Sequence, residues 1–458
     1  MIRRVFVFLA GALLLAVPAM AVEIPQVATQ APAYNCDYQP SCEVAPGVYG
    51  KMSSPVKSKF DLSIGGMVRL DYAYNSQNLG AAGFVLPGKP GGGVNAGGSP
   101  AYKQDQSEMT ARISRFWLKV AGPTFLGAKT GALIEADFLG GGASNNEEGN
   151  LRMRHGYGTL DWANTQVLFG QFWDIFGPAA ASTIDFRQGS TFGTPNSPRV
   201  AQLRLTQKVN FNADNYLKLV LGVQNPAADQ QGALNAGSVP NVAGQVMFVS
   251  KALGVAPGFY GMSMNSLQAG FFGLWGSEQL ATSQHVDVYG YGAYAFVPLL
   301  KSKDGKSRAM TASLEAQAYI SAGMNWNGAN ASTGLAYVAA SSLTTNTAGP
   351  NLTSGNSAAK GYGVYGQVIF YPIQDLGFTA GYERRNAMNY GSFANAVGST
   401  FEKYNELIYA SASYDLNAAV RVSAEYLHAR TQYGNSPLAG QGNFGQVNGT
   451  RVAAYYFF

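Results

Sequence analysis

The sequence of 458 residues has few charged side chains, only 12% of the total, and the two signs are nearly balanced. Lysine and arginine number 31 against 26 acidic residues; without Arg3 and Arg4, which precede a predicted cleavage site, the net charge of +5 falls to about +3. A nucleic-acid-binding domain carries a clustered basic patch or stripe, and the sequence contains neither. Composition therefore argues against nucleic acid as a partner.

Long hydrophobic runs are also scarce, and the only one, VFVFLAGALLLAVPAM, covers residues 5–20. Two arginines precede this run and an Ala-Met-Ala sequence closes it. A membrane-spanning helix needs about 20 apolar residues, whereas a basic start, a shorter apolar middle and an A-x-A end are typical of a secretory signal peptide. We predict a signal peptide over residues 1–21 and a mature chain that begins at Val22.

Cysteine occurs only twice, at Cys36 and Cys42. Both lie in residues 22–59, which hold several prolines and show neither a helical period nor heptads, so we predict an extended periplasmic arm. In an oxidising compartment the two cysteines can close a short disulfide loop. The competing interpretation, a redox or haem-attachment site, is weaker because neither C-x-x-C nor C-x-x-C-H is present.

Motifs of known enzymes are missing as well. The three histidines, His155, His285 and His428, are dispersed, and neither H-E-x-x-H nor G-x-S-x-G occurs. The glycine runs PGGGVNAGG and LGGGASNN lie in loop-like contexts without a strand-to-helix transition. We therefore predict no catalytic residue, no metal site and no cofactor. We place His155 on the outward face of its strand, as a subunit contact or a membrane-edge residue.

What the sequence does have, from Phe60 to its end, is an alternation of apolar and polar residues. In FDLSIGGMVRLDYAY this alternation has period two, the pattern of a half-buried strand. The apolar set is Phe60, Leu62, Ile64, Val68, Leu70, Tyr72 and Tyr74, and the intervening set contains Asp61, Ser63, Arg69 and Asp71. Such a strand presents one face to an apolar medium and the other to water.

The same pattern predicts sixteen strands connected as an antiparallel up-and-down meander. The predicted strands are 60–74, 107–121, 129–139, 150–163, 164–171, 199–211, 215–225, 241–250, 266–277, 284–297, 307–322, 360–371, 376–388, 403–414, 419–432 and 449–458. Tight connections such as 212–214 and 415–418 alternate with longer Gly-, Asn- and Ser-rich segments such as 172–198 and 323–359. One rim of the sheet is therefore expected to carry short turns and the other long loops.

Two all-β architectures could carry this pattern. A soluble sandwich turns its apolar faces to a shared core and is seldom this long without a second domain. A transmembrane barrel turns its apolar face to lipid, and because every backbone polar group must then be paired within the protein, the sheet has to close. The signal peptide, the even strand count and the asymmetry of the turns favour a transmembrane β-barrel over residues 60–458, with short periplasmic turns and long extracellular loops.

The last strand, NGTRVAAYYFF, has to pair with the first strand if the barrel closes. Its terminal aromatic residues would lie at the membrane boundary, where aromatic rings are enriched. Val452, Ala454, Tyr456 and Phe458 also resemble the C-terminal signal of bacterial outer-membrane proteins, which the outer-membrane assembly machinery reads. We therefore predict that Tyr456 and Phe458 act in assembly.

A closer resemblance lies in the first half of the barrel. The stretches RFWLKVAG, KTGALIEADFLGG, NLRMRHGYGTL and VLFGQFWDIFGP look like successive strands of trimeric Gram-negative porins, especially the DcaP-like family. The resemblance covers residues 108–210 and the C-terminal strand. It implies a sixteen-stranded homotrimeric barrel in the bacterial outer membrane that passes small anionic solutes, with one loop folded inward. One departure is the arm before Phe60, which lacks the heptads of a coiled coil that could support a trimer.

The inward faces of the predicted strands carry many basic side chains. With Leu151, Met153 and Tyr157 facing lipid, Arg152 and Arg154 point inward. The same reasoning on the second and sixth strands adds Arg115, Lys119, Arg204 and Lys208. The predicted opposing acids are Glu135 and Asp137 on the third strand, with Asp174 and Asp185 in segment 172–198. These residues predict a basic wall on one side of the pore.

Segment 172–198, with its small residues and its mixture of Phe and Asp, is the predicted inward loop. Bases on one side of a constriction and acids on the other produce a transverse field that orients charged solutes. The alternative is that the inward arginines are simply solvated, or that they pair locally with neighbouring acids.

The function implied by these features is passive diffusion of small polar solutes, with a preference for small carboxylates and other anions. The expected partners are outer-membrane lipid, the anionic solutes and two further copies of the chain. Two alternatives stay open, a barrel that sheathes a cytochrome in an electron conduit and an outer-membrane hydrolase.

Overall fold

The computed structural model describes residues 60–80, 82–90, 104–140, 149–185, 192–195, 199–225, 239–279, 285–322, 360–388, 402–434 and 442–458. The predicted signal peptide and arm, with Cys36 and Cys42, lie outside these residues, so their assignment stays a prediction.

Seventeen strands form a single sheet in the described part of the chain. They are β1 (Asp61–Asn75), β2 (Gln106–Thr110), β3 (Arg115–Phe125), β4 (Ala128–Gly140), β5 (Asn150–Asp161), β6 (Thr165–Trp173), β7 (Arg199–Asn210), β8 (Asn215–Gln224), β9 (Asn241–Pro257), β10 (Met264–Gln279), β11 (His285–Leu300), β12 (Thr311–Ala322), β13 (Lys360–Ile373), β14 (Leu376–Ala387), β15 (Glu402–Asp415), β16 (Val420–Tyr433) and β17 (Phe444–Phe457). A 3-10 turn, η4 (Phe259–Gly261), separates β9 from β10. No helix within the described ranges is long and apolar enough to span a membrane.

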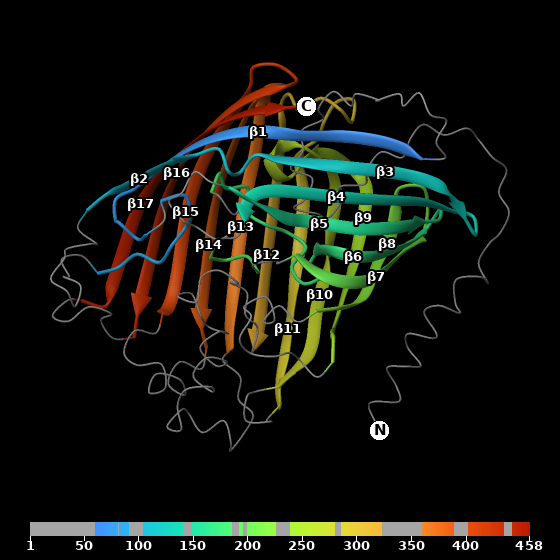
Figure 1. The fold of residues 1–458 in the computed structure, drawn as a ribbon, viewed down its shortest axis with the longest axis horizontal. Coiled ribbons are helices and arrows are strands. Elements are labelled where there is room, and N and C mark those ends of the chain that lie inside the picture. Colours follow the sequence, from blue (N-terminus) through green and yellow to red (C-terminus); the bar gives the residue numbers. More distant parts are fainter. Residues whose placement is uncertain are drawn as a thin grey trace.

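The sheet closes on itself because the last strand pairs with the first. β1 and β17 are antiparallel with Met67 opposite Phe457, and Gly66 and Phe458 exchange two backbone hydrogen bonds of 3.0 and 3.1 Å. The blue strand β1 and the red C-terminal end of the chain accordingly lie together at the upper edge of Figure 1. The predicted transmembrane barrel and its closure by the C-terminal strand are confirmed.

The predicted second strand, residues 107–121, is broken into β2 and β3. Both pieces pair with β1, with Thr110 opposite Asp71 and Arg115 opposite Met67. Between them, Ser114 N–H donates to the carbonyl of Ala111 and closes a tight turn. The two pieces therefore occupy one position in the wall. The barrel has sixteen strand positions, and the seventeenth strand is the second piece at this position.

The alternation predicted from the sequence becomes an outer and an inner face. On β1, Val68 and Leu70 are at least half exposed, whereas Arg69 and Asp71 are buried. On the last strand, Tyr456 is 54% exposed while Phe457 is 3% exposed. A closed sheet with apolar side chains on its outer face satisfies its own backbone and suits hydrocarbon.

The tight turns at one rim, called here the short-turn rim, are stabilised by asparagine side chains. Asn212 Oδ1 accepts hydrogen bonds from the N–H groups of Asp214 and Asn215, at 3.0 and 2.9 Å. Asn417 does the same for Ala419 and Val420. Because asparagine can replace a backbone acceptor in a turn, these short connections form locally and leave the long connections to the opposite rim.

Candidate pore constriction

The segment between β6 and β7 folds into the barrel, as the sequence predicted. Residues 174–185 and 192–195 are its described parts. Ile175, Phe176 and Phe192 are buried in a cluster with Met247 and Tyr409 of the inner wall. The ring of Phe176 meets that of Phe272 edge-on, with centroids 4.9 Å apart. This inward segment therefore packs on the wall and does not extend away from the rim.

Polar side chains of the wall hold the backbone of the inward segment, which has no ladder of its own. Five backbone N–H groups of the segment donate to side chains of the wall at 2.7 to 3.2 Å. The pairs are Ile175 with Gln224 of β8, Ala179 with Gln317 of β12, Ser182 with Gln367 of β13, Ile184 with Glu425 of β16 and Gly193 with Glu383 of β14. Arg69 of β1 donates to the carbonyl of Ile184 at 2.9 Å. Since a buried N–H or C=O needs a partner, the glutamines and glutamates of these strands determine the path of the segment.

A compact cluster of arginines and acids lies on β3, β4 and β5. Arg154 donates through Nε to Glu135 at 2.5 Å and through Nη1 to Asp137 at 3.1 Å. Arg152 makes a two-pronged contact with Asp137, at 2.9 and 2.6 Å. Arg115 reaches Glu135 at 3.4 Å. Three arginines thus share two carboxylates, which leaves the cluster with a formal excess of one positive charge.

These contacts correct the expectation that Glu135 and Asp137 oppose the arginines across the pore. β4 lies between β3 and β5, and Asp137 is the register partner of both Arg115 and Arg152. Side chains on the same face of neighbouring strands meet at about 5 Å between Cβ atoms. The acids are therefore within the basic cluster, as the alternative of local pairing proposed.

A β-bulge at Arg154 changes which residues of β5 face inward. The register passes from Glu135 opposite His155 to Ala136 opposite Met153, so Arg154 is the extra residue. An inserted residue shifts the phase of alternation. His155 and Tyr157 consequently turn inward and are buried, whereas the sequence pattern had placed both outward.

His155 packs in an aromatic group beside the cluster. Its ring centroid lies 5.0 Å from that of Phe172 and 5.5 Å from that of Trp173. The expectation of a subunit contact or membrane-edge position for His155 is wrong, because the bulge brings it to the inner face. Among the described residues, no group of three or more His, Cys, Asp or Glu side chains could hold a metal ion.

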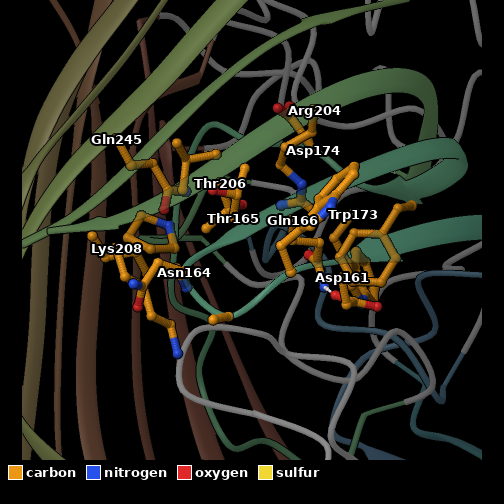
Figure 2. Close-up of a pocket in the computed structure, with 17 residues that line it drawn as sticks. Asp161, Asn164, Thr165, Gln166, Trp173, Asp174, Arg204, Thr206, Lys208 and Gln245 are labelled. Atoms are coloured by element: carbon orange, nitrogen blue, oxygen red, sulfur yellow. Dashed lines mark hydrogen bonds between the residues drawn. The ribbon is translucent and has the colours of Figure 1, made fainter. Parts of the chain in front are cut away.

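Arg204 and Lys208 are inward but lie apart from the cluster. Arg199, at the start of β7, interacts electrostatically with Arg152 and Arg154, and Arg204 is five residues, about 16 Å, further along the strand. The guanidinium of Arg204 lies 4.6 Å from the centroid of Phe172. Arg204 and Lys208 instead line a cavity of about 170 Å³ beside the start of the inward segment (Figure 2). The single basic wall predicted from the sequence is thus two groups.

Asp174 and Asp185 lie at the two ends of the first described part of the inward segment. Asp174 Oδ1 accepts hydrogen bonds from the Phe176 N–H and from Gln224, both at 2.7 Å. Burial raises the pKa of Asp174 to about 6, although these two hydrogen bonds and Arg204 favour its charged form. Asp185 is buried and accepts a hydrogen bond from the Thr183 hydroxyl.

Sequence reasoning did not select the charged pair on β1. Arg69 is fully buried and donates to Asp71 at 2.8 and 2.6 Å. Its guanidinium also lies 4.9 Å from the centroid of Tyr455 on β17. The alternation had already placed Arg69 and Asp71 on the polar face of β1, so the signal was present. Only the tertiary structure brings Ile184 of the inward segment next to them.

The architecture resembles that of solved membrane channels. The outer membrane channel DcaP of Acinetobacter baumannii matches with a TM-score of 0.60 and 19% identity, over 89% of this chain and 99% of that chain. This chain has the porin fold. The anion-selective porin from Comamonas acidovorans gives a TM-score of 0.54 at 10% identity, over 87% of this chain and all of that chain.

OmpT of Vibrio cholerae in its trimer form matches the porin fold of this chain with a TM-score of 0.50 and 11% identity, over 88% of this chain and all of the other. No protein-family model and no curated sequence matches the chain. At these identities the likeness establishes the fold, so the predicted resemblance to porins is confirmed at that level.

Proposed function

We propose that this protein is a bacterial outer-membrane porin through which small polar solutes diffuse, with a preference for anions such as small carboxylates. The observation that carries the proposal is an inward segment tied to β8, β12, β13 and β16 inside a closed barrel. The arginine cluster lies on β3 to β5, on a different part of the same inner wall. Such an arrangement narrows a lumen next to fixed positive charge.

The preference for anions rests on the local balance of charge. At physiological salt, charges more than about 8 Å away are largely screened, so the overall net charge has little influence on a passing ion. Three arginines against two carboxylates leave a positive excess where the solute passes. Arg152 has 37% of its side chain exposed, and a guanidinium binds carboxylates with two parallel hydrogen bonds.

The other parts of the proposal rest on the fold. The solved porin-fold structures include a trimer form, which supports a homotrimer here, and those named above are described as outer-membrane proteins or porins. A non-catalytic role belongs to the same proposal. The cytochrome-sheath alternative is not favoured, because the inward segment takes up the interior that an inserted cytochrome would need.

The test is the reversal potential of the purified protein in a planar bilayer under a KCl gradient. We expect the wild type to prefer chloride, and the double variant Arg152→Glu, Arg154→Glu to lose or reverse this preference. Lys303→Glu, on an exposed turn at the short-turn rim, makes a matched charge change away from the cluster and should leave the potential unchanged.

Cation selectivity of the wild type, or an unchanged potential in a folded double variant, would contradict the proposal. If the double variant does not assemble, Arg152→Gln alone removes the most accessible charge and should shift the potential in the same direction.

A further inference from the structure

The cavity beside the start of the inward segment has a lining that differs from that of the arginine cluster. Its lining runs along the sheet from Asp161 of β5 to Gln245 of β9 and includes Asn164 and Asp174, and its volume is about 170 Å³ (Figure 2). This volume is several times the roughly 30 Å³ that one water molecule occupies in the liquid. The cavity can therefore accept a small solute.

Three cationic side chains from two adjacent strands line this cavity. Arg204 and Lys208 come from β7 and Lys218 comes from β8. Thr206, between Arg204 and Lys208 in the same inward phase, adds a hydroxyl to the lining (Figure 2). Opposite Arg204 is Gly222, where a Cβ would approach Ile175 and the Arg204 Cα, so the missing side chain leaves room for the inward segment against this wall.

Lys208 and Lys218 are direct register partners in the pairing of β7 with β8. Like charges directly opposite each other on one face of a sheet are destabilising. The ammonium of Lys208 lies 5.5 Å from the ring centroid of Tyr216, on the same face. A cation–π contact lowers the energy of one ammonium, and an anion between the two ammonium groups would offset the repulsion between them.

Both acids in the lining accept hydrogen bonds from other donors, although Asp174 Oδ2 accepts none. Asp161 accepts hydrogen bonds on both oxygens, from Thr159 at 2.7 Å and from Gln166 at 2.6 Å. Asp174 Oδ1 accepts two, from Phe176 and Gln224. Three cations against these two acids leave a positive excess, as in the arginine cluster, but here two of the three cations are lysines.

We propose that this cavity is a binding site for a compact oxyanion with more than one negative charge, of the inorganic phosphate class. Lysine acts on phosphate as a point charge from any side, so the ammonium groups of the register partners Lys208 and Lys218 and the Thr206 hydroxyl beside Lys208 match an anion whose acceptor oxygens point in several directions. The inference goes beyond the proposed function, since diffusion through a pore needs no bound solute, and it is tested without measuring conductance.

The experiment is calorimetric titration of inorganic phosphate into the folded barrel in detergent, at low chloride concentration. We expect one saturable site per chain in the wild type and an affinity at least about tenfold weaker in Lys208→Gln, Lys218→Gln, because each ammonium contributes a charge-assisted hydrogen bond. The control Lys303→Gln removes one positive charge from an exposed turn and should bind as the wild type does.

A second measurement separates binding from folding. In phosphate-free buffer the double variant should unfold at or above the temperature of the wild type, because it removes a like-charge pair, whereas added phosphate should raise the unfolding temperature of the wild type alone. The single variants Lys208→Gln and Lys218→Gln each serve if the double variant does not fold.

The absence of a saturable site in the wild type would overturn the proposal, as would unchanged affinity in the double variant or equal binding of chloride. Since these results concern binding in detergent, they leave the pore proposal to its own bilayer test.

Discussion

At the scale of single residues, the candidate constriction depends on three arginines that share two carboxylates. Glu135 accepts from Arg154 at 2.5 Å and from Arg115 at 3.4 Å, while Asp137 accepts from Arg152 and Arg154. Removing one arginine therefore leaves each carboxylate with a partner, but removing one carboxylate leaves a single acid in a cluster of three guanidinium groups. The acids are expected to control both the stability of the cluster and the size of its positive excess.

Glu135→Gln should therefore increase the preference for anions and lower the free energy of unfolding by at least about 1–3 kcal/mol, the usual cost when a buried donor loses its hydrogen-bond acceptor. Reversal potentials and denaturant unfolding in detergent measure the two effects. Asp214→Asn, on an exposed turn at the short-turn rim, makes the same charge change outside the lumen and should alter neither. A drop in anion preference in Glu135→Gln would contradict the charge balance described here.

Asp174 is expected to make the pore sensitive to pH. Its pKa of about 6, raised by burial, exceeds the usual value near 4, so the folded protein holds this proton more tightly than the unfolded chain does. Its contribution to stability is therefore present at low pH and declines as pH rises from about 4 to about 6. Lowering the pH from 7 to 5 removes a negative charge near Arg204 and should strengthen the anion preference. Reversal potentials at both pH values, compared with Asp174→Asn, measure the effect; an equal shift in that variant would assign it elsewhere.

At the scale of elements, hydrogen bonds to backbone N–H groups hold the described parts of the inward segment against the barrel wall. Gly193 donates to Glu383 at 2.7 Å, and a Cβ at this position would overlap the Val364 carbonyl and lie 2.7 Å from the Glu383 Cβ. Only glycine can approach the wall between β13 and β14 so closely. The width of the lumen therefore depends on contacts that are distant from the arginine cluster in the sequence.

Gly193→Ala should lift this part of the segment from the wall and raise the single-channel conductance without reversing selectivity. The matched control is Gly442→Ala, because a Cβ at Gly442 would meet nothing within 4 Å, and its conductance should equal that of the wild type. Retention of the heat-resistant, folded form verifies that the barrel itself is intact. An unchanged conductance in folded Gly193→Ala would show that this contact does not set the pore width.

At the scale of the whole molecule, the barrel is closed by the contact between the two ends of the described chain. The Phe458 backbone exchanges hydrogen bonds with Gly66, while its side chain, 42% exposed, lies on the outer face. Backbone and ring can therefore be tested separately, because an alanine at 458 keeps the closing hydrogen bonds and loses only the ring.

Phe458→Ala should reduce the amount of barrel in the outer membrane, with unfolded chain left in the periplasm, while the unfolding temperature of the assembled fraction stays close to that of the wild type. Deletion of Phe458 should lower both, since it also removes two hydrogen bonds of closure. Membrane fractionation and heat-modifiable migration measure the two quantities. A normal amount of assembled Phe458→Ala would contradict an assembly role for the aromatic ring.

The sequence by itself determined the sixteen strand positions, the inner and outer faces except beyond the bulge in β5, and the closure by the last strand, because alternation with period two is a local property that a regular strand repeats. Asn212 and Asn417 likewise specify their turns locally. The path of segment 172–198 into the barrel was predictable from its length and composition, but its partners on β8 to β16 were not, since they are contributed by strands far away in the chain.

Only the tertiary structure decided which lumen charges meet. The extra residue at Arg154 turns His155 inward, and the sequence pattern of β5 does not predict this bulge. The position of β4 between β3 and β5 places Glu135 and Asp137 among the arginines and not opposite them. The register of β7 separates Arg204 from Arg152 along the barrel axis, although both share the inward phase. Alternation indicates only the face on which a residue lies. Its position along the barrel axis and its partners are set by pairing register and bulges, which depend on neighbouring strands.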